Sequence, residues 1–249
     1  MAQTQKVKKT RSKFKIVIFV LIAIVILGGV AFGVYKGYMA KQRFVFSEHL
    51  SDAAATINGE TLTYKDLSFY VLYEELKVEN EAKIYNPEST KDWWNTHING
   101  EFISVSARNT AMNMAIHDKI MYDLAKKNNI SLNEEDKVQL NYRQTDFWED
   151  LLDEQKESLP ASKDFINETM EHIALGEKYQ GELATDKHTN AFEYGYDGYE
   201  YGQMLKNDYK VEIDDNYKKL EFGEITIHHD KVNYVNGVNL DNMKERLKK

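Results

Sequence analysis

The chain of 249 residues contains no cysteine and only two prolines. The absence of cysteine excludes a disulfide scaffold, a thiol nucleophile, an iron–sulfur centre, a cysteine-ligated zinc site and a lipid attached through cysteine. The low proline content and the apolar share of 42% exclude a disordered chain and a collagen-like repeat. The composition is therefore that of a globular protein, long enough for one ordinary domain or two small ones.

Charged residues are missing from residues 16–35, which read IVIFVLIAIVILGGVAFGVY. A helix of that length spans roughly 30 Å, the hydrocarbon thickness of a bilayer. The run is longer than the apolar region of a secretion signal, about 7–15 residues, and no small-x-small cleavage site follows it directly. We therefore predict an uncleaved transmembrane helix over residues 16–35. Within it, Gly29 and Gly33 form a GxxxG pair that would allow a homodimer.

Acidic residues are missing from residues 1–15, which carry six lysine or arginine residues. A basic flank of this kind stays in the cytoplasm, so we expect a cytoplasmic tail over 1–15 and an extracytoplasmic location for everything after the helix. Residues 36–249 hold 26 basic and 40 acidic side chains, a balance of −14. Because such a surface repels phosphate groups, we expect no nucleic-acid partner.

The exported part divides into a short connector, residues 36–53, and one domain, residues 54–249. Asn58-Gly59 between β-branched residues predicts a tight hairpin, and Thr63 with Asp66 predicts the cap of the next helix. Apolar residues at helical spacing in that helix predict a buried face of Phe69, Leu72, Tyr73 and Leu76.

Three longer helices follow in the pattern. The first is predicted over residues 103–127 and ends at a left-handed cap, Asn128-Asn129. Ser131 and Glu134 predict a capping box for a helix over 133–156, and a further helix is predicted over 162–183. Alternating apolar residues over 225–235 predict a late strand that pairs with the early one near Ile57. The fold class is therefore mainly α with a small β element, closed by N- and C-terminal strands.

Eight aromatic residues are candidates for a surface that binds an unfolded client or a partner protein. They are Trp93, Trp94, Phe147, Trp148, Tyr194, Tyr196, Tyr199 and Tyr201. Aromatic rings give a large contact area at a modest entropic cost. In the alternative interpretation, which is the commoner case, the tryptophans lie in the core and the tyrosines form an ordered loop tip.

Motifs of enzymes are absent from the sequence: it contains no GxSxG, SxxK, Walker A or HExxH pattern and no calcium-binding loop. His228-His229-Asp230 is the only local cluster of potential metal ligands. Adjacent residues on a strand point to opposite faces, which favours a solvated turn over a metal site. We therefore assign no catalytic, cofactor-binding or metal-binding residue.

Two stretches together resemble the SurA/PrsA-type extracytoplasmic chaperones. The first runs from Ala55 to Leu67 and contains ATINGE, Leu62-Thr63 and Asp66-Leu67; the second, IMYDLAKKNNISLNEE, covers residues 120–135. They resemble, respectively, the strand, Asn-Gly turn and capped helix that open the domain, and the long helix followed by a capped acidic helix start. The resemblance covers roughly residues 53–185, with a looser similarity over 211–235.

This resemblance implies a SurA N-terminal-like helical domain that binds unfolded exported polypeptides without catalysis. The histidine-bearing strand and the Gly-Phe-rich core of the parvulin prolyl isomerase lobe are not recognisable in residues 185–249, so isomerase activity is not expected. The lipidated cysteine of PrsA-like proteins is replaced here by the predicted helix. Two alternatives stay open at this point: a cell-envelope assembly subunit or wall-binding adaptor, and a residual peptidyl-prolyl isomerase.

Overall fold

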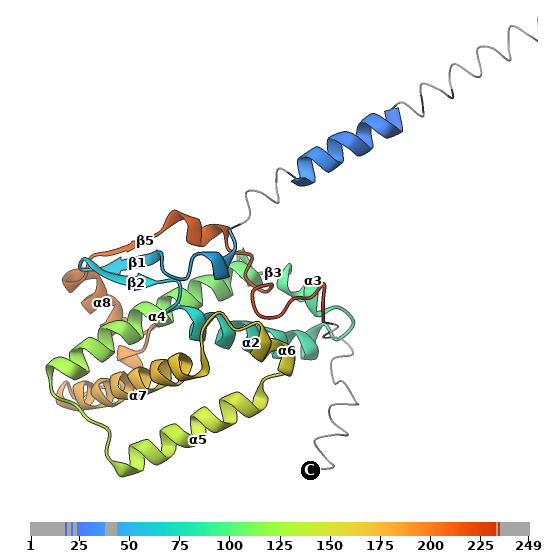
Figure 1. Ribbon diagram of the computed structural model, residues 1–249. Helices are drawn as coiled ribbons and strands as arrows, with labels where there is room; N and C mark the ends of the chain where they lie inside the picture. Colours follow the sequence, from blue (N-terminus) through green and yellow to red (C-terminus); the bar gives the residue numbers. More distant parts are fainter. Residues whose placement is uncertain (1–17, 19–20, 22–23, 38–43, 233, 235–249) are drawn as a thin grey trace, which may run out of the picture. The chain divides into compact units, whose positions relative to one another are not determined.

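The computed structural model describes residues 18, 21, 24–37, 44–232 and 234 (Figure 1). They belong to two compact units, one ending at Phe44 and one beginning at Val45. In the first unit, residues 24–37 are helical and their apolar side chains are exposed. Among the residues placed by the structure, no helix is both long and apolar enough to cross a bilayer. The cytoplasmic tail, 1–15, and six residues of the predicted span lie outside the described residues, so the anchor stays a prediction.

In the second unit, a three-stranded antiparallel sheet joins the two ends of the domain. Strands β1 (Ala53–Ile57) and β2 (Glu60–Thr63) form the predicted hairpin, with positive φ angles of 51° at Asn58 and 86° at Gly59. Strand β5 (Val211–Ile213) pairs with the other edge of β1, giving the order β2-β1-β5. The early strand therefore does pair with a later one, but not with residues 225–235 as predicted.

The late strand itself was predicted in the wrong place. It lies at Val211–Ile213, whereas residues 225–232 form turns and bends. The reason is visible in the hydrogen bonds: the backbone N–H groups of Ile225 and Thr226 donate to the Glu75 carboxylate instead of to a neighbouring strand. The alternation of residues 225–232 is typical of a strand, but the buried Glu75 side chain holds their backbone in an irregular conformation.

The rest of the domain is mainly helical, as predicted. The helices are α2 (Ser68–Tyr85), α3 (Thr90–Trp94), α4 (Ile103–Lys127), α5 (Glu134–Asp150), α6 (Asp153–Glu157), α7 (Lys163–Asp186) and α8 (Tyr199–Asp208). Short 3-10 turns are η1 (Phe46–Glu48), η2 (Ala191–Tyr194) and η3 (Asp215–Lys219). A two-stranded hairpin, β3 (His97–Ile98) and β4 (Glu101–Phe102), leads into α4.

Helix α4 is the central element and confirms its predicted range. Its buried face carries Met112, Ile116 and Ile120, and it packs against both α2 and α7 (Figure 1). Asn129 has a φ of 57°, and the N–H of Ile130 donates to the carbonyl of Ala125, which is the Schellman ending expected of such a cap. Local sequence therefore accounts for the C-terminal end of this helix.

The helix predicted over 133–156 is two helices. Leu151 is buried in an extended conformation, which ends α5 at Asp150 and lets α6 begin at Asp153. The capping box that starts α5 uses Asn133 and Asp136 rather than Ser131 and Glu134. Thr63 and Asp66 likewise form the reciprocal hydrogen bonds expected of a helix cap. The α-helix α2, however, begins only at Ser68, two residues after Asp66.

Candidate functional site

The eight predicted aromatic residues do not form one surface. Trp94, Tyr194 and Tyr201 are buried. Trp93, Phe147 and Trp148 are half-buried, while Tyr196 and Tyr199 are exposed. The two residues Trp93 and Trp94 lie on α3, and Phe147 and Trp148 lie on α5. The four tyrosines lie in η2, in α8 or between these two elements.

Two of the tyrosines are held in the core by a histidine of α4. His117 donates from Nε2 to the carbonyl oxygen of Tyr194 at 2.8 Å, and its ring contacts the Tyr201 ring edge-on at 4.7 Å between centroids. Because His117 is itself buried, this contact attaches the tyrosine-rich segment to α4. Tyr196, Tyr199 and Phe192 of η2 are the aromatic groups that this segment leaves exposed.

An open groove lies beside Trp148, where the end of α5, helix α6 and the start of α7 meet. Its volume is about 1110 Å³, and its lining combines the apolar Trp148, Leu159 and Ala161 with two acidic and two lysine side chains. Trp148 donates from Nε1 to Asn167 at 2.7 Å, and Lys163 lies 5.3 Å from its ring centre. The indole is therefore fixed in place while one side of it borders the groove.

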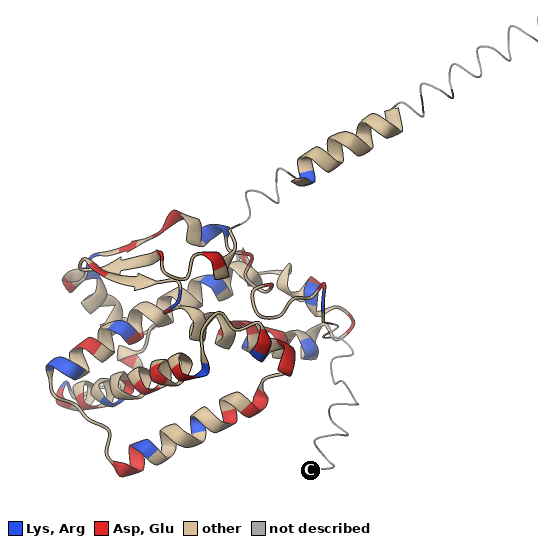
Figure 2. Ribbon diagram, in the orientation of Figure 1, with Lys and Arg blue, Asp and Glu red and all other residues tan. Residues whose placement is uncertain are grey.

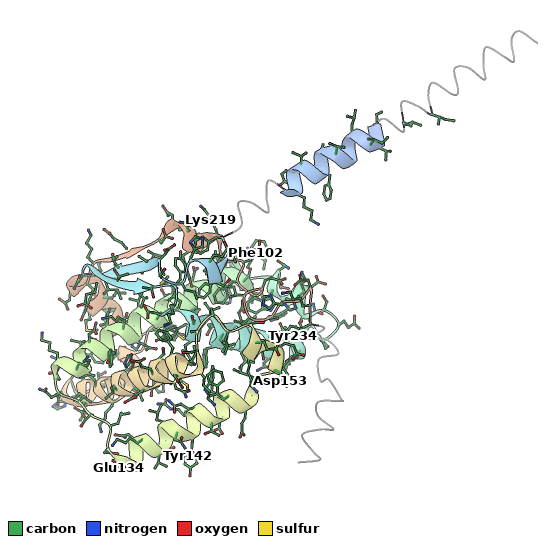
Figure 3. The ribbon with its side chains drawn as sticks, in the orientation of Figure 1. Phe102, Glu134, Tyr142, Asp153, Lys219 and Tyr234 are labelled. Carbon is green, nitrogen blue, oxygen red and sulfur yellow. The ribbon has the colours of Figure 1, made fainter. Side chains whose placement is uncertain are left out.

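Helix α5 leaves other apolar groups uncovered. Leu140 is its only buried residue, whereas Val138 and Tyr142 are exposed. Figure 3 shows Tyr142 directed away from α7, toward solvent. Figure 2 marks acidic residues along α5 and α7, in keeping with the negative balance of the sequence.

A second apolar surface lies where α2, α3 and the β3–β4 hairpin meet. The rings of Tyr85 and Trp93 stack at 5.2 Å with an angle of 17° between their planes. Tyr85 is 69% exposed, and Trp93 borders a recess together with the exposed Ile98. We call Tyr85, Trp93 and Ile98 the α2–α3 aromatic surface. Because the Tyr85 and Trp93 rings already stack on each other, a ligand would not need to order them on binding.

The recess beside this surface has a volume of about 240 Å³ and is lined by α2, the hairpin and the first turns of α4. Three carboxylates line it, those of Glu74, Glu81 and Glu101, against a single ammonium group, that of Lys77. Lys77 pairs with Glu74 at 3.1 Å. Burial raises the pKa of Glu74, although Lys77 opposes that shift. The recess therefore combines apolar walls with an excess of negative charge.

Glu75 of α2 is a fully buried carboxylate that binds a distant segment. It accepts hydrogen bonds from the N–H groups of Gly223 (2.6 Å), Ile225 (3.1 Å) and Thr226 (2.6 Å), and also from the Thr226 hydroxyl. Burial raises the pKa of Glu75, and these four donors act in the opposite direction. The Glu75 carboxylate therefore accepts the backbone hydrogen bonds that a neighbouring strand would accept in a sheet.

Glu79, one turn further along α2, is buried between Trp94 and His229. Its Oε2 atom accepts from Trp94 Nε1 at 3.0 Å and lies 3.6 Å from His229 Nε2. The His229 side chain is only 4% exposed, which corrects the expectation of a solvated turn at 228–230. Burial lowers the pKa of His229 and so favours the neutral imidazole.

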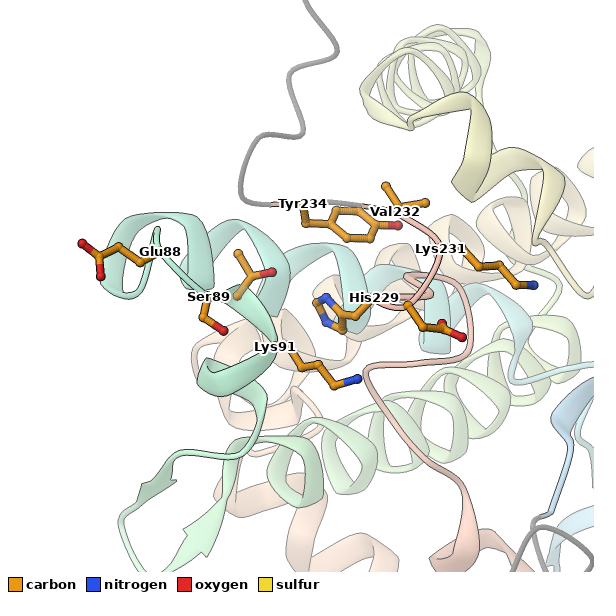
Figure 4. Close-up of a pocket in the computed structure, with 9 residues that line it drawn as sticks. Glu88, Ser89, Lys91, His229, Lys231, Val232 and Tyr234 are labelled. Atoms are coloured by element: carbon orange, nitrogen blue, oxygen red, sulfur yellow. The ribbon is translucent and has the colours of Figure 1, made fainter. Parts of the chain in front are cut away.

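Next to His229 lies a pocket of about 390 Å³ between α3 and residues 229–234 (Figure 4). The close-up shows the imidazole between Lys91 of α3 and the ring of Tyr234. The buried Tyr234 hydroxyl and His229 Nε2 have no hydrogen-bond partner in the part of the chain that the structure describes. Lys91 pairs with Glu224 at 3.1 Å, so the pocket mixes charges of both signs and selects no single class of ligand.

Sequence reasoning missed the buried glutamates of α2. The predicted buried face was wrong at Tyr73, which is exposed, because the face that packs inward carries Glu75 and Glu79 among apolar residues. Glutamate favours helices and solvent, so its periodicity gives no signal of burial. The available clue was weak: apolar residues occur on all sides of α2 and its glutamates are interspersed among them, so the helix has no clear apolar stripe.

Within residues 24–37 and 44–232, no three potential ligands among histidine, aspartate and glutamate are grouped to hold a metal ion. Comparisons of the chain with protein-family models, with curated proteins and with solved structures found no match.

Proposed function

We propose that this protein is a membrane-anchored extracytoplasmic chaperone that binds unfolded exported polypeptides without catalysis, in the manner of the SurA/PrsA-type proteins it resembles. The observation that carries the proposal is the α2–α3 aromatic surface, in which the exposed Tyr85 ring stacks on the half-buried Trp93 ring beside the exposed Ile98. The resemblance over residues 53–185 supports it, as does the closure of the N-terminal hairpin by a late strand.

The chemistry of the surface suits an extended, partly apolar chain. Aromatic side chains bury a large area with few rotatable bonds, so little conformational entropy is lost on contact. Tyr85 is 69% exposed, so the outer side of the stacked pair is open to such a chain. The groove beside Trp148 offers a second apolar contact of the same kind.

The anchor gives such a binding domain its location. With residues 16–35 in the bilayer and the basic tail 1–15 in the cytoplasm, the domain from Val45 onward would meet polypeptides as they emerge from export. A fixed position near the membrane raises the local concentration of the binding site, which compensates for a modest affinity.

The test uses the full-length chain in lipid nanodiscs and a chemically denatured client that aggregates on dilution. We expect wild type to suppress light scattering, and the double variant Tyr85→Ser/Ile98→Ser to lose at least half of that effect. The control is Phe192→Ser, which removes an apolar residue that is 83% exposed on η2, away from both surfaces. Aggregation that is unchanged by wild type at several-fold excess over empty nanodiscs would refute the proposal, as would equal effects of the two substitutions.

The adaptor alternative has one specific observation in its favour, the exposed pair Tyr196 and Tyr199. A photo-reactive residue in place of Tyr199 would separate the two functions in intact cells. Capture of one fixed partner at that position supports an adaptor, whereas many client proteins captured at Tyr85 support the chaperone.

A further inference from the structure

The recess beside the α2–α3 aromatic surface holds charge that the domain itself does not neutralise. Glu81 and Glu101 are half-buried, and neither side-chain carboxylate forms a hydrogen bond or a close ion pair with a residue that the structure places. Lys77 is bonded to Glu74 and its charge also acts on Glu81, so one ammonium group faces three carboxylates in the recess. Two carboxylates in a partly desolvated site favour a cationic partner, because water screens them less there than on an open surface.

The walls of the recess fit the rest of a long basic side chain. Val78 of α2, Ile98 of the hairpin and Ile103 of α4 line it with aliphatic groups, which suit the methylene stem of arginine or lysine. Trp93, which also borders the recess, offers its indole ring. A guanidinium group in contact with an indole and a carboxylate gains both a cation–π and an ionic interaction.

We propose that the recess binds an arginine or lysine side chain of the client polypeptide, so that the protein prefers extended segments in which a basic residue is flanked by apolar ones. This inference rests on the proposed function and names its substrate class. In the bound state, Glu81 and Glu101 pair with the cation, the aliphatic walls contact its stem, and the Trp93 ring borders its charged group. The flanking apolar residues lie on Tyr85 and Ile98.

The overall charge of the exported part agrees with this preference. Residues 36–249 carry a balance of −14, which attracts basic segments at long range and repels acidic ones. The groove beside Trp148 lacks such a bias because two acidic and two lysine side chains line it. We therefore assign the basic residue to the recess and the apolar contacts to both surfaces.

The test measures binding of two fluorescent peptides to the full-length chain. Both have the same apolar sequence with one central position, which is arginine in the first and the neutral isostere citrulline in the second. We expect the arginine peptide to bind about tenfold more tightly at low salt, a difference of about 1.4 kcal/mol. The double variant Glu81→Gln/Glu101→Gln should reduce that ratio to less than about twofold, mainly through weaker binding of the arginine peptide. The control Glu182→Gln, an exposed acid on α7, should keep the wild-type ratio.

Each outcome decides the matter. Equal affinity of wild type for the two peptides overturns the inference and leaves the proposed function standing, and this comparison needs no variant to fold. A preference for arginine that persists in the double variant overturns the assignment to the recess. Failure of both peptides to bind overturns the inference together with the proposed function.

Discussion

The attachment of residues 223–226 to α2 through Glu75 can be tested by one isosteric change. In the substitution Glu75→Gln, the side chain keeps its shape but offers one oxygen instead of two. The present carboxylate accepts from three backbone N–H groups and one hydroxyl. An amide oriented with its oxygen toward Thr226 then directs its own NH₂ group at the N–H groups of Gly223 and Ile225, so two hydrogen bonds are lost.

The size of the effect follows from these two bonds. A hydrogen bond to a charged group contributes about 1.5–3 kcal/mol, so losing two costs at least about 3 kcal/mol. The raised pKa of Glu75 indicates that burial of its charge offsets part of the stabilisation that the hydrogen bonds provide in wild type. A neutral glutamine amide does not carry this cost of burying a charge. We therefore expect a net loss of about 2 kcal/mol in the free energy of unfolding. For a protein of this size, that lowers Tm by roughly 4–8 °C.

Urea unfolding of the full-length chain, followed by tryptophan fluorescence at pH 7, measures the loss directly. Trp94 reports on this region because Gly223 approaches its ring closely. Glu182→Gln is the matched control, since it makes the same chemical change at an exposed site. A Glu75→Gln variant within about 0.5 kcal/mol of wild type would show that these hydrogen bonds do not hold the segment, and the account would be wrong.

Three further predictions concern the same region and the cap of α4. Gly223→Ala should cost about 3 kcal/mol by thermal unfolding, because φ is +94° and a Cβ would lie 2.6 Å from the Trp94 ring, whereas Gly181→Ala, where nothing lies within 4 Å, should not destabilise α7. Burial lowers the pKa of His229, so its contribution to stability is complete above about pH 6.5, its unfolded value, and is lost as the pH falls through the folded pKa. His229→Gln should therefore flatten the loss of stability between pH 7 and pH 5, and a slope equal to that of wild type would contradict this. Asn129→Gly should raise the free energy of unfolding by about 0.5 kcal/mol, and with it the urea midpoint, because glycine adopts the φ of 57° at this cap without strain. A lower midpoint would argue against the left-handed cap.

How far the sequence predicts this fold is shown by α4 and the first hairpin. The range of α4, its ending at Asn129 and the Asn58-Gly59 turn all rest on interactions within a few residues, and each is confirmed. The break of the predicted helix at Leu151 was missed, because it depends on where that leucine packs. The strand predicted over 225–235 was wrong because its amides pair with Glu75.

The candidate sites divide in the same way. The sequence named eight aromatic residues as candidates for a binding surface, but their exposure could not be predicted: Trp93 borders a recess while its neighbour Trp94 is buried against Glu79. Adjacent residues on a helix point in directions about 100° apart, so which one faces solvent depends on what packs against the helix. The recess itself combines α2, the hairpin and α4, and no local pattern contains it.

The sequence by itself determined the elements whose hydrogen bonds and side-chain spacing are local: the long helices, the tight turn, and the contrast between a basic apolar N-terminus and an acidic remainder. Only the tertiary structure decided which polar groups are buried and which aromatic groups are exposed. The physical reason is that burial belongs to contacts between residues distant in the chain, such as Glu75 with Thr226, and the hydropathy of a single residue does not encode its partner.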